Sequence, residues 1–263
     1  MGIASGLADP NVYVLDPCCG TGGYLVAVLR RIAQTLQNQG SDALTMLDVK
    51  RAAIERVFGF EILPAPFVVA HLQLGLLLQQ LGVPIASEKD ERAAIYLTNA
   101  LTGWEPVDPE KERYVQASLS GLPELKEERD AAQHVKQQTP ILVILGNPPY
   151  NAFAGTSPEE EGDLVQPYKQ GLIKEWGIKK FNLDELYVRF FRLAERRIAE
   201  MSGKGIVCFI SNYSWLREPS FVVLRQHLLS AFDSFWVENM HGDRSISEYA
   251  PDGHTSETIF AMP

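Results

Sequence analysis

Short apolar runs alternate with longer amphipathic stretches along most of this chain. Residues 12–15 are a β-branched apolar run typical of a buried strand, and apolar side chains then recur at helical spacing through residues 24–37. The same reasoning predicts strands at 12–15, 57–60, 95–97, 141–145, 206–210, 234–238 and 258–262, and helices at 24–37, 64–81, 123–138, 183–199 and 221–232.

The order of these elements predicts the fold class. Strands that alternate with helices form a parallel sheet that helices cover on both faces. The strand at 258–262 follows the strand at 234–238 with no helix between them, so we expect it to enter antiparallel. We therefore predict an α/β fold with a seven-stranded, mostly parallel sheet, in which one domain accounts for residues 1–263.

Composition and charge narrow the class of protein. The 263 residues are 46% hydrophobic and 22% charged, which is ordinary for a globular chain and argues against collagen, coiled coil or general disorder. The net charge of −9 gives no general footprint for nucleic acid, because DNA-binding chains are usually basic. Three cysteines, two of them adjacent, cannot form a disulfide framework and predict a reducing, cytoplasmic location.

Membrane and metal functions are not indicated. The most apolar stretch, residues 67–78, is too short to span a bilayer, so we expect no membrane partner. The five histidines are scattered, without a second ligand pair at zinc spacing, so we expect no metal. Residues 151–170 combine glycine, proline and an acidic run, which predicts a loop, with a lid over the site as the alternative.

The segment DPCCGTGG follows the first predicted strand. Asp16 ends that strand, where ligands bind in open α/β sheets, and Gly20, Gly22 and Gly23 let the backbone approach a ligand closely. The helix that follows offers free N–H groups and a positive dipole end. The segment lacks both the G-x-G-x-x-G spacing and the G-x-x-x-x-G-K-[ST] phosphate loop. An ordinary tight turn is the alternative.

The end of the second predicted strand strengthens the case for a ligand. Glu61 stands there, and an acidic residue at this place can hold ribose hydroxyls. The ligand is therefore expected to be nucleoside-like. Cys18 and Cys19 are expected to be packed small residues rather than reactive thiols.

A second turn, Asn147-Pro148-Pro149-Tyr150, follows the most apolar predicted strand. Two prolines make the backbone rigid and remove two amide donors, which leaves the carbonyls of Asn147 and Pro148 as acceptors. The Asn147 side-chain oxygen adds a third acceptor, and Tyr150 offers a flat face for a planar base. This cluster suits an amino group on a planar ring. A rigid turn with a surface tyrosine is the alternative.

These motifs carry a resemblance to a known family. DPCCGTGGYL, then FE at 60–61, then NPPY at 147–150 resemble, in this order, the motifs of gamma-class N6-adenine DNA methyltransferases. The stretches VLDPCCGTGGYL, ILVILGNPPYN and SETIFAMP look most like the methyltransferase domain of single-polypeptide Type I restriction-modification enzymes. The resemblance covers nearly the whole chain. It implies a Rossmann-like class I methyltransferase that moves a methyl group from S-adenosylmethionine to adenine N6 in DNA.

The resemblance also assigns a cofactor site. The turn that would hold the methionine part of S-adenosylmethionine comprises Asp16, Pro17, Cys18, Cys19, Gly20, Thr21, Gly22 and Gly23. Glu61 would hold the ribose hydroxyls, and Asn147 would border the cofactor. Asn99, where the family often has Asp, would contact the cofactor adenine.

The catalytic assignment falls on the second turn. Asn147 and the Pro148 carbonyl would accept hydrogen bonds from the target amino group, whose nitrogen then attacks the sulfonium methyl directly. Pro149 belongs to the same rigid turn, and Tyr150 would stack on the target base. A base within a duplex cannot reach such a pocket, so the nucleotide must flip out.

The predicted helix at 183–199 carries four arginines. Spacings of three and four put Arg189, Arg192 and Arg196 on one face, and Arg197 lies beside them. The favoured interpretation is a solvated face on which these arginines pair with nearby acids, namely Glu185, Glu195 and Glu200. Contact with DNA phosphates is the alternative.

Other residues are weaker candidates for DNA contact. Lys174, Lys179 and Lys180 lie nearer the second turn and are either phosphate contacts or ordinary surface lysines. Tyr213 and Trp215 follow the fifth predicted strand. They either line a base pocket or pack in the core.

The resemblance also implies missing parts. Gamma-class enzymes carry a helical segment before the first strand and a target recognition domain after the last, and we expect both to be absent here. The chain is thus expected to be a catalytic core whose parent protein has the recognition domain and helicase or nuclease parts. Its charge of −9 then belongs to a core separated from the DNA-reading parts, and it should hold DNA weakly by itself.

Three alternative functions stay open. One is a truncated, non-catalytic remnant that binds S-adenosylmethionine weakly or not at all. Another is a protein glutamine N5-methyltransferase, which also uses an NPPY turn to hold a planar amide. A nicotinamide dehydrogenase is the least favoured, because the glycine spacing differs and the NPPY turn would have no role.

Overall fold

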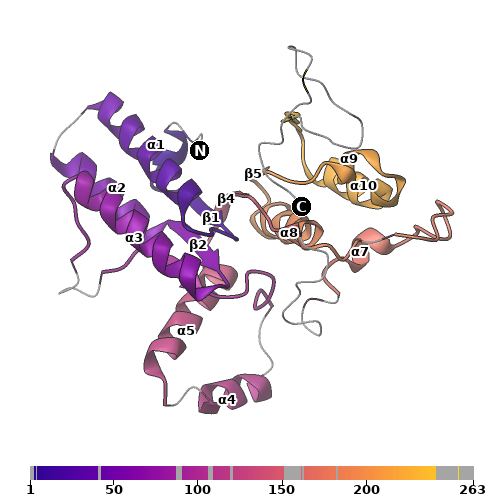
Figure 1. Ribbon diagram of the computed structural model, residues 1–263, viewed down its shortest axis with the longest axis horizontal. Coiled ribbons are helices and arrows are strands. Elements are labelled where there is room, and N and C mark those ends of the chain that lie inside the picture. Colours follow the sequence, from indigo (N-terminus) through magenta and orange to yellow (C-terminus); the bar gives the residue numbers. More distant parts are fainter. Residues whose placement is uncertain are drawn as a thin grey trace. The chain divides into compact units, whose positions relative to one another are not determined.

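The computed structural model describes Ile3 and residues 5–40, 43–86, 91–105, 109–118, 121–150, 161, 163–181, 183–240 and 254. The chain divides into two compact units, Met1–Ala231 and Phe232–Pro263. The first unit contains a sheet with helices packed against it (Figure 1).

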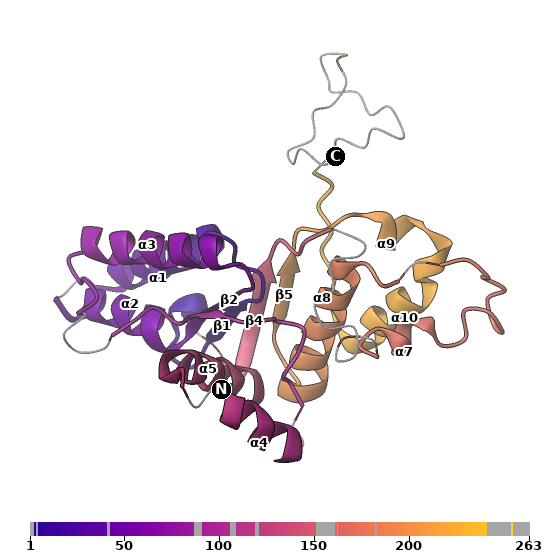
Figure 2. The ribbon, with the colours of Figure 1, turned by 60° about the horizontal axis from the view of Figure 1, so that its bottom comes forward.

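The sheet has five parallel strands in the order β3-β2-β1-β4-β5. They are β1 (Tyr13–Asp16), β2 (Val57–Glu61), β3 (Ile95–Leu97), β4 (Ile141–Gly146) and β5 (Ile206–Phe209). All five were predicted within one residue at each end. The order means that the chain moves outward from β1 to β3 and then returns to the other side of β1 with β4. Figure 2 shows β4 and β5 following β1 on that side.

Helices and short turns connect the strands. The N-terminal part contains η1 (Gly6–Ala8), α1 (Gly23–Gln39), α2 (Ala43–Glu55), α3 (Pro64–Gln80), α4 (Pro109–Ser118) and α5 (Pro123–Gln138). After β4 come α7 (Gln166–Lys169), α8 (Leu186–Glu195), the π-helical η3 (Arg196–Ser202), α9 (Ser214–Arg217), η4 (Pro219–Phe221) and α10 (Val222–Ala231). No helix among these described residues is long and apolar enough to cross a membrane.

Alternation along β2 separates the two faces of the sheet. Val57 belongs to the large apolar cluster formed with α1, α2 and α3, and Gly59 lies against Leu25 of α1. Phe60 points the other way, where Lys136 of α5 lies over its ring. Helices therefore cover both faces of β2, as a parallel sheet requires and as the sequence predicted.

At β5, side chains on one face of the sheet are no longer covered by the described helices. Ile206 pairs with Val143 of β4 in the parallel register, so both side chains share the face that α1 covers at β1. Yet Ile206 is 63% exposed, and Cys208, two residues on, is exposed too. A parallel strand is normally buried on both faces, and β5 departs from that rule.

The predicted count of seven strands is wrong for the described residues. Residues 234–238 form no strand, and Trp236 within them is 88% exposed. A strand exists only where its backbone pairs with a neighbour, and no described residue pairs with this segment. The predicted strand at 258–262, and with it the antiparallel end of the sheet, lies outside the described residues.

Candidate functional site

The residues predicted to carry the chemistry gather at one edge of the sheet. Because all five strands are parallel, their carboxyl ends meet at a common edge. Asp16 ends β1, Glu61 ends β2, Asn99 follows β3 and Asn147 follows β4. β1 and β4 are neighbours although β2 and β3 lie between them in the sequence, so the strand order reverses where they meet. Open α/β sheets bind ligands at that point.

The glycine turn connects the end of β1 to α1. Asp16 Oδ1 accepts a hydrogen bond from the backbone N–H of Cys18 at 3.1 Å. The N–H of Cys19 donates to the carbonyl of Phe60 on β2 at 2.9 Å, which ties the turn to the next strand. Gly22 has a φ of 85°, a left-handed conformation that favours glycine, and a Cβ there would lie 3.1 Å from the Cβ of Ala70 on α3.

Burial shows which part of the turn faces outward. Pro17, Cys19 and Gly22 are at most partly accessible, whereas Thr21 and Gly23 are exposed. The backbone near the start of α1 is therefore accessible from outside. A ligand can approach the free N–H groups of this helix.

The two adjacent cysteines are packed groups. Cys19 is 5% exposed, and its Sγ lies 3.0 Å from where a Cβ on Gly59 would stand. Burial foremost, with the nearby charge of Asp16, raises the pKa of both the Cys18 and the Cys19 thiol. A raised pKa disfavours the reactive thiolate, which agrees with the prediction of packed small residues.

Glu61 is held against the glycine turn. Its Oε2 accepts from the backbone N–H of Gly20 at 2.9 Å. Its Oε1 accepts from the N–H groups of Ile62 and Leu63, each at 2.8 Å. The structure thus brings Glu61 and the turn together, as predicted, and three backbone donors set the direction of the carboxylate.

Asp16 carries a buried carboxylate oxygen without a partner. The residue is 0% exposed, and no described residue bonds its Oδ2. Burial raises the pKa of Asp16 from 3.8 to about 7, the charge of Glu61 adds to the rise, and the Cys18 hydrogen bonds oppose it. A ligand that brings a positive charge or a strong donor to this oxygen would relieve the cost of its burial.

The Asn147–Tyr150 turn lies directly beside Asp16. Gly146 precedes it, and a Cβ on Gly146 would stand only 2.7 Å from Asp16 Oδ1. Only a glycine fits between the two strand ends at this approach. The turn therefore begins beside the buried carboxylate, at the ends of β1 and β4.

Through its hydroxyl, Tyr150 contacts the side-chain oxygen of Asn147, three residues earlier in the same turn. Its hydroxyl lies 2.6 Å from Asn147 Oδ1 and 3.3 Å from the carbonyl oxygen of Ile210, and its single proton can go to one of them. Its ring is 6.5 Å from that of Tyr187. Burial raises the pKa of Tyr150, so the hydroxyl acts as a neutral donor. Pro148 is buried and Pro149 is exposed within the turn.

Asn99 is held at both ends of its amide. Its Oδ1 accepts from the N–H of Leu101 at 2.9 Å, and its Nδ2 donates to Glu161 Oε1 at 2.8 Å. Glu161 is 1% exposed and forms an ion pair with Arg189 of α8. Sequence reasoning missed Glu161, since an acidic residue within a predicted loop carries no signal that it meets the end of β3.

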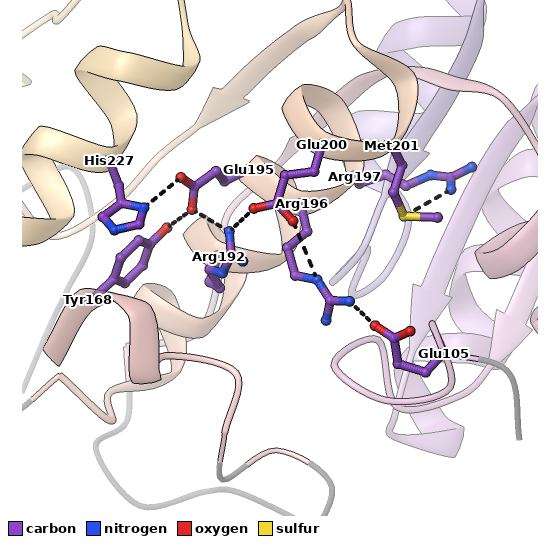
Figure 3. Close-up of polar contacts among 9 residues, drawn as sticks. All are labelled: Glu105, Tyr168, Arg192, Glu195, Arg196, Arg197, Glu200, Met201 and His227. Carbon is purple, nitrogen blue, oxygen red and sulfur yellow. Dashed lines mark hydrogen bonds and ion pairs between the residues drawn. The ribbon is translucent and has the colours of Figure 1, made fainter. Parts of the chain in front are cut away.

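The arginine helix pairs with acids but is not solvated. Arg192 lies 2.7 Å from Glu195 and 2.6 Å from Glu200, which confirms those two pairings (Figure 3). The predicted solvent exposure is wrong, because Arg192 is only 9% exposed and Arg197 only 4%. For Arg192, the reason is that side chains of α7 and α10 meet its partner Glu195.

Those two side chains come from distant parts of the sequence. The Tyr168 hydroxyl of α7 donates to Glu195 at 2.7 Å, and His227 Nδ1 of α10 lies 3.3 Å from it (Figure 3). Arg196 pairs with Glu105 and so is engaged as well. Arg196 and Glu195 thus join separate segments, and the guanidinium groups of Arg192 and Arg196 are both engaged by carboxylates.

Of the remaining basic and aromatic candidates, some are exposed and one is packed in the core. Lys174, Lys179 and Lys180 are exposed and stay candidates for phosphate contact. Trp215 packs in the core, with its ring 5.1 Å from that of Phe191. Tyr213 is 41% exposed, so of the two aromatic candidates it is the one at the surface.

A family model covers most of the chain. Residues 10–217 match the family model described as "MmeI, DNA-methyltransferase domain". The chain is 27% identical to the adenine-specific methyltransferase PglX of Streptomyces coelicolor over 262 residues, which is 95% of this chain and 20% of PglX.

Solved structures with a similar fold include that of a Type ISP restriction-modification enzyme. The Type ISP enzyme LlaGI with a DNA substrate mimic gives a TM-score of 0.64 at 21% identity, over 86% of this chain and 17% of LlaGI. The DrdV–DNA complex gives 0.62 at 23% identity, over 86% of this chain and 20% of DrdV. The chain thus spans about a fifth of the length of these relatives.

Proposed function

Because the chain belongs to the family of the MmeI DNA-methyltransferase domain, we propose that it is the catalytic core of a restriction-modification type DNA methyltransferase that acts on adenine N6. The observation that carries the proposal is the close approach of two strand ends. It brings the acceptors of the Asn147–Tyr150 turn beside the buried carboxylate of Asp16. The name of PglX, an adenine-specific methyltransferase, favours adenine over other bases.

We propose S-adenosylmethionine as the cofactor, and the residues present fit it. This cofactor supplies a methyl group on a positively charged sulfonium, together with an ammonium group. The orphaned Asp16 Oδ2 suits such a cation, and the glycine turn from Pro17 to Gly23 would hold its methionine part. Glu61 would accept from the ribose hydroxyls, and Asn99 would meet the adenine.

The target base would be held by the second turn. Asn147 Oδ1 and the Pro148 carbonyl would accept the two N–H bonds of the adenine amino group. These bonds orient the nitrogen and keep its electron density available for attack on an electrophilic methyl. In the ligand-free protein the Tyr150 hydroxyl lies 2.6 Å from Asn147 Oδ1. An amide oxygen has two lone pairs, so this oxygen can accept from the hydroxyl and from a base amino group.

Tyr150 would then stack on a flipped base. Stacking on an aromatic ring contributes roughly 1–3 kcal/mol per base, which offsets part of the cost of taking the base out of the duplex. The Ile210 carbonyl, 3.3 Å from the hydroxyl, offers it a second hydrogen-bond acceptor. These two acceptors would hold the ring in place when the base binds.

The parent protein would provide the parts that read DNA. Phosphate contacts dominate affinity for DNA, and this chain has a net charge of −9 with its helix arginines in ion pairs. By itself it should bind DNA weakly, whereas a recognition domain and helicase or nuclease parts would come from the rest of the polypeptide. Three free cysteines support a reducing, cytoplasmic location.

Transfer of a tritiated methyl group tests the proposal. We expect label from S-adenosylmethionine in DNA, recovered as N6-methyladenine, and at least a roughly hundredfold loss in Asn147→Ala, by analogy with the loss of one preorganised hydrogen-bonding group at an active site. Asn38→Ala, at an exposed position near the end of α1, is the matched control and should keep wild-type activity.

Two other outcomes would redirect the proposal. Label in protein acceptors but not in DNA would point to glutamine methylation instead. Cofactor binding without transfer to either acceptor would identify a non-catalytic binding module.

A further inference from the structure

The amide of Asn99 is oriented by two partners of opposite chemistry. The Leu101 N–H can only donate, and it lies 2.9 Å from Asn99 Oδ1. The Glu161 carboxylate can only accept, and it lies 2.8 Å from Asn99 Nδ2. Both contacts require the same orientation of the amide. They therefore place its oxygen toward Leu101 and its nitrogen toward Glu161.

Glu161 is itself held in place. Its second oxygen pairs with Arg189 of α8, and the side chains of Glu161 and Arg189 are 1% and 13% exposed. Breaking such a buried pair leaves an uncompensated charge, so the carboxylate stays where the guanidinium holds it. The backbone beneath Asn99 is also fixed, because Lys136 Nζ donates to the Asn99 carbonyl at 2.7 Å and to Thr98 Oγ1 at 2.8 Å.

We infer that Glu161 is a positioning residue for cofactor selection, which sets the Asn99 oxygen as the group that meets the cofactor base. The inference rests on the proposed function. Glu161 is too deeply buried to touch a cofactor and acts through Asn99. An amide oxygen has two lone pairs, so Asn99 Oδ1 can accept from Leu101 and from an exocyclic amino group. The outcome is selection for a nucleoside that carries an amino group, such as adenosine, over one with a carbonyl oxygen there.

The arrangement also joins two distant parts of the chain. Asn99 follows β3, and Glu161 lies 62 residues later, beyond the Asn147–Tyr150 turn. The selectivity of the cofactor site is therefore set by a residue from the part of the chain that carries the second turn.

Two nucleosides measure this selectivity directly. S-adenosylhomocysteine has an amino group at position 6 of its base, and S-inosylhomocysteine has a carbonyl oxygen. Isothermal calorimetry gives a dissociation constant for each with the 263-residue chain. The ratio of the two constants is compared between variants, so that other differences between the nucleosides cancel. Wild type should prefer S-adenosylhomocysteine by about tenfold or more.

Glu161→Gln should weaken this preference. The introduced glutamine has one acceptor oxygen for two donors, Arg189 and Asn99, and the guanidinium takes it. The glutamine N–H then faces the Asn99 N–H, and a flip of the Asn99 amide would instead set that N–H against the N–H of Leu101. Neither orientation is fully satisfied, so part of the population shows the Asn99 N–H to the cofactor.

A second substitution and a control complete the design. Adding Asn99→Asp to Glu161→Gln should restore the preference, because the new carboxylate accepts from the glutamine N–H and shows an oxygen in either orientation. Glu175→Gln, at an exposed glutamate, is the control and should keep the wild-type ratio.

The outcomes separate the two proposals. A folded Glu161→Gln protein with the wild-type ratio would overturn the inference and leave the proposed function standing. If wild type binds neither nucleoside at millimolar concentration, the proposed cofactor site fails and the inference fails with it. If Glu161→Gln does not fold, the double variant decides, since the glutamine N–H in it again meets an acceptor. A restored ratio supports the inference, and a lost ratio overturns it.

Discussion

Two parts of the first unit place site residues at the same sheet edge, but different interactions stabilise each part. The N-terminal part, β1–β3 with α1–α3, is held by apolar packing, and side chains such as Leu25, Leu29 and Leu74 are 0% exposed. The C-terminal part, β4 and β5 with α7–α10, buries charges as well, and Glu161, Arg192 and Glu195 are each 9% exposed or less.

The site groups differ in the same way. In the N-terminal part, Asp16 and Glu61 accept from backbone N–H groups of the turns around them. In the C-terminal part, helices are joined by polar contacts between side chains, and the pair of Glu195 with Arg192 is deeply buried. Apolar packing tolerates small adjustments, whereas a buried charge needs its specific partner. The N-terminal part also buries Arg56, which is 7% exposed and donates to the carbonyls of Leu7 and Val12. Asp16 is the exception there, because its burial leaves one oxygen unbonded by any described residue.

The largest predicted effect comes from that exception. The folded pKa of Asp16 is raised to about 7 from 3.8, so the folded state binds the proton more tightly. The stabilisation that comes from this tighter proton binding is complete below pH 3.8 and is lost as the pH rises through 7. Asp16→Asn should therefore match wild type near pH 4 and exceed its unfolding free energy by up to about 4 kcal/mol at pH 8.

Urea unfolding of both proteins between pH 4 and pH 8 checks this result. A cofactor that brings positive charge to Asp16 should bind more tightly to wild type as the pH rises through 7, with release of a proton. Equal unfolding midpoints at pH 8 would show that the buried carboxylate has partners that lower its cost.

The second effect tests the ion pairs of the C-terminal part. Arg192→Met leaves Glu195 buried without its guanidinium and should lower the unfolding free energy by about 3 kcal/mol or more. Arg51→Met is the matched control in the N-terminal part, since Arg51 and Asp48 are 3.9 Å apart and their side chains are 69% and 58% exposed. That change should stay within about 0.5 kcal/mol. A similar loss in both variants, measured by urea unfolding, would remove the contrast between the two parts.

The third effect lies where the two parts meet. Gly146→Ala would push a Cβ to 2.7 Å from Asp16 Oδ1, so the Asp16 carboxylate or the strand ends must shift. We expect a loss of about 2 kcal/mol in stability and a larger loss in methyl transfer. Gly75→Ala within α3 meets no atom within 4 Å and should stabilise the protein by about 0.5–1 kcal/mol. Retained methyl transfer by Gly146→Ala would show that this approach is not needed for function.

The smallest effect compares the same substitution on two strands. Ile95→Val on β3, where Ile95 is 0% exposed, should cost about 1 kcal/mol. Ile206→Val on β5, where Ile206 is 63% exposed, should change the unfolding free energy by less than about 0.5 kcal/mol. Equal costs in urea unfolding would mean that β5 is covered in solution.

Sequence reasoning succeeded where the signal is local. Each of the five strands is an apolar run bounded by turn residues, and the polar motifs follow these runs directly, so both could be predicted. It missed α2 and α4. In α2 the buried residues include Val49, Ala52 and Ala53, a helical spacing with small side chains that give weak periodicity. In α4 polar residues dominate, and no apolar stripe marks the helix.

The failures share a physical cause. Residues 234–238 have the composition of a strand, but pairing decides whether a strand forms, and composition does not report a partner. The spacing of Arg189, Arg192 and Arg196 predicts a shared helix face. Whether that face meets water or other helices depends on α7 and α10, which lie elsewhere in the sequence.

The sequence by itself determined the strand ends and the chemistry placed at them, because a run of apolar residues and the turn that ends it are adjacent along the chain. Only the tertiary structure decided that β4 returns beside β1, that Glu161 orients Asn99 across 62 residues, and that Arg192 and Arg197 are buried. Those contacts join residues far apart in sequence. Hydrophobic periodicity specifies which face of an element is buried but not which element covers it.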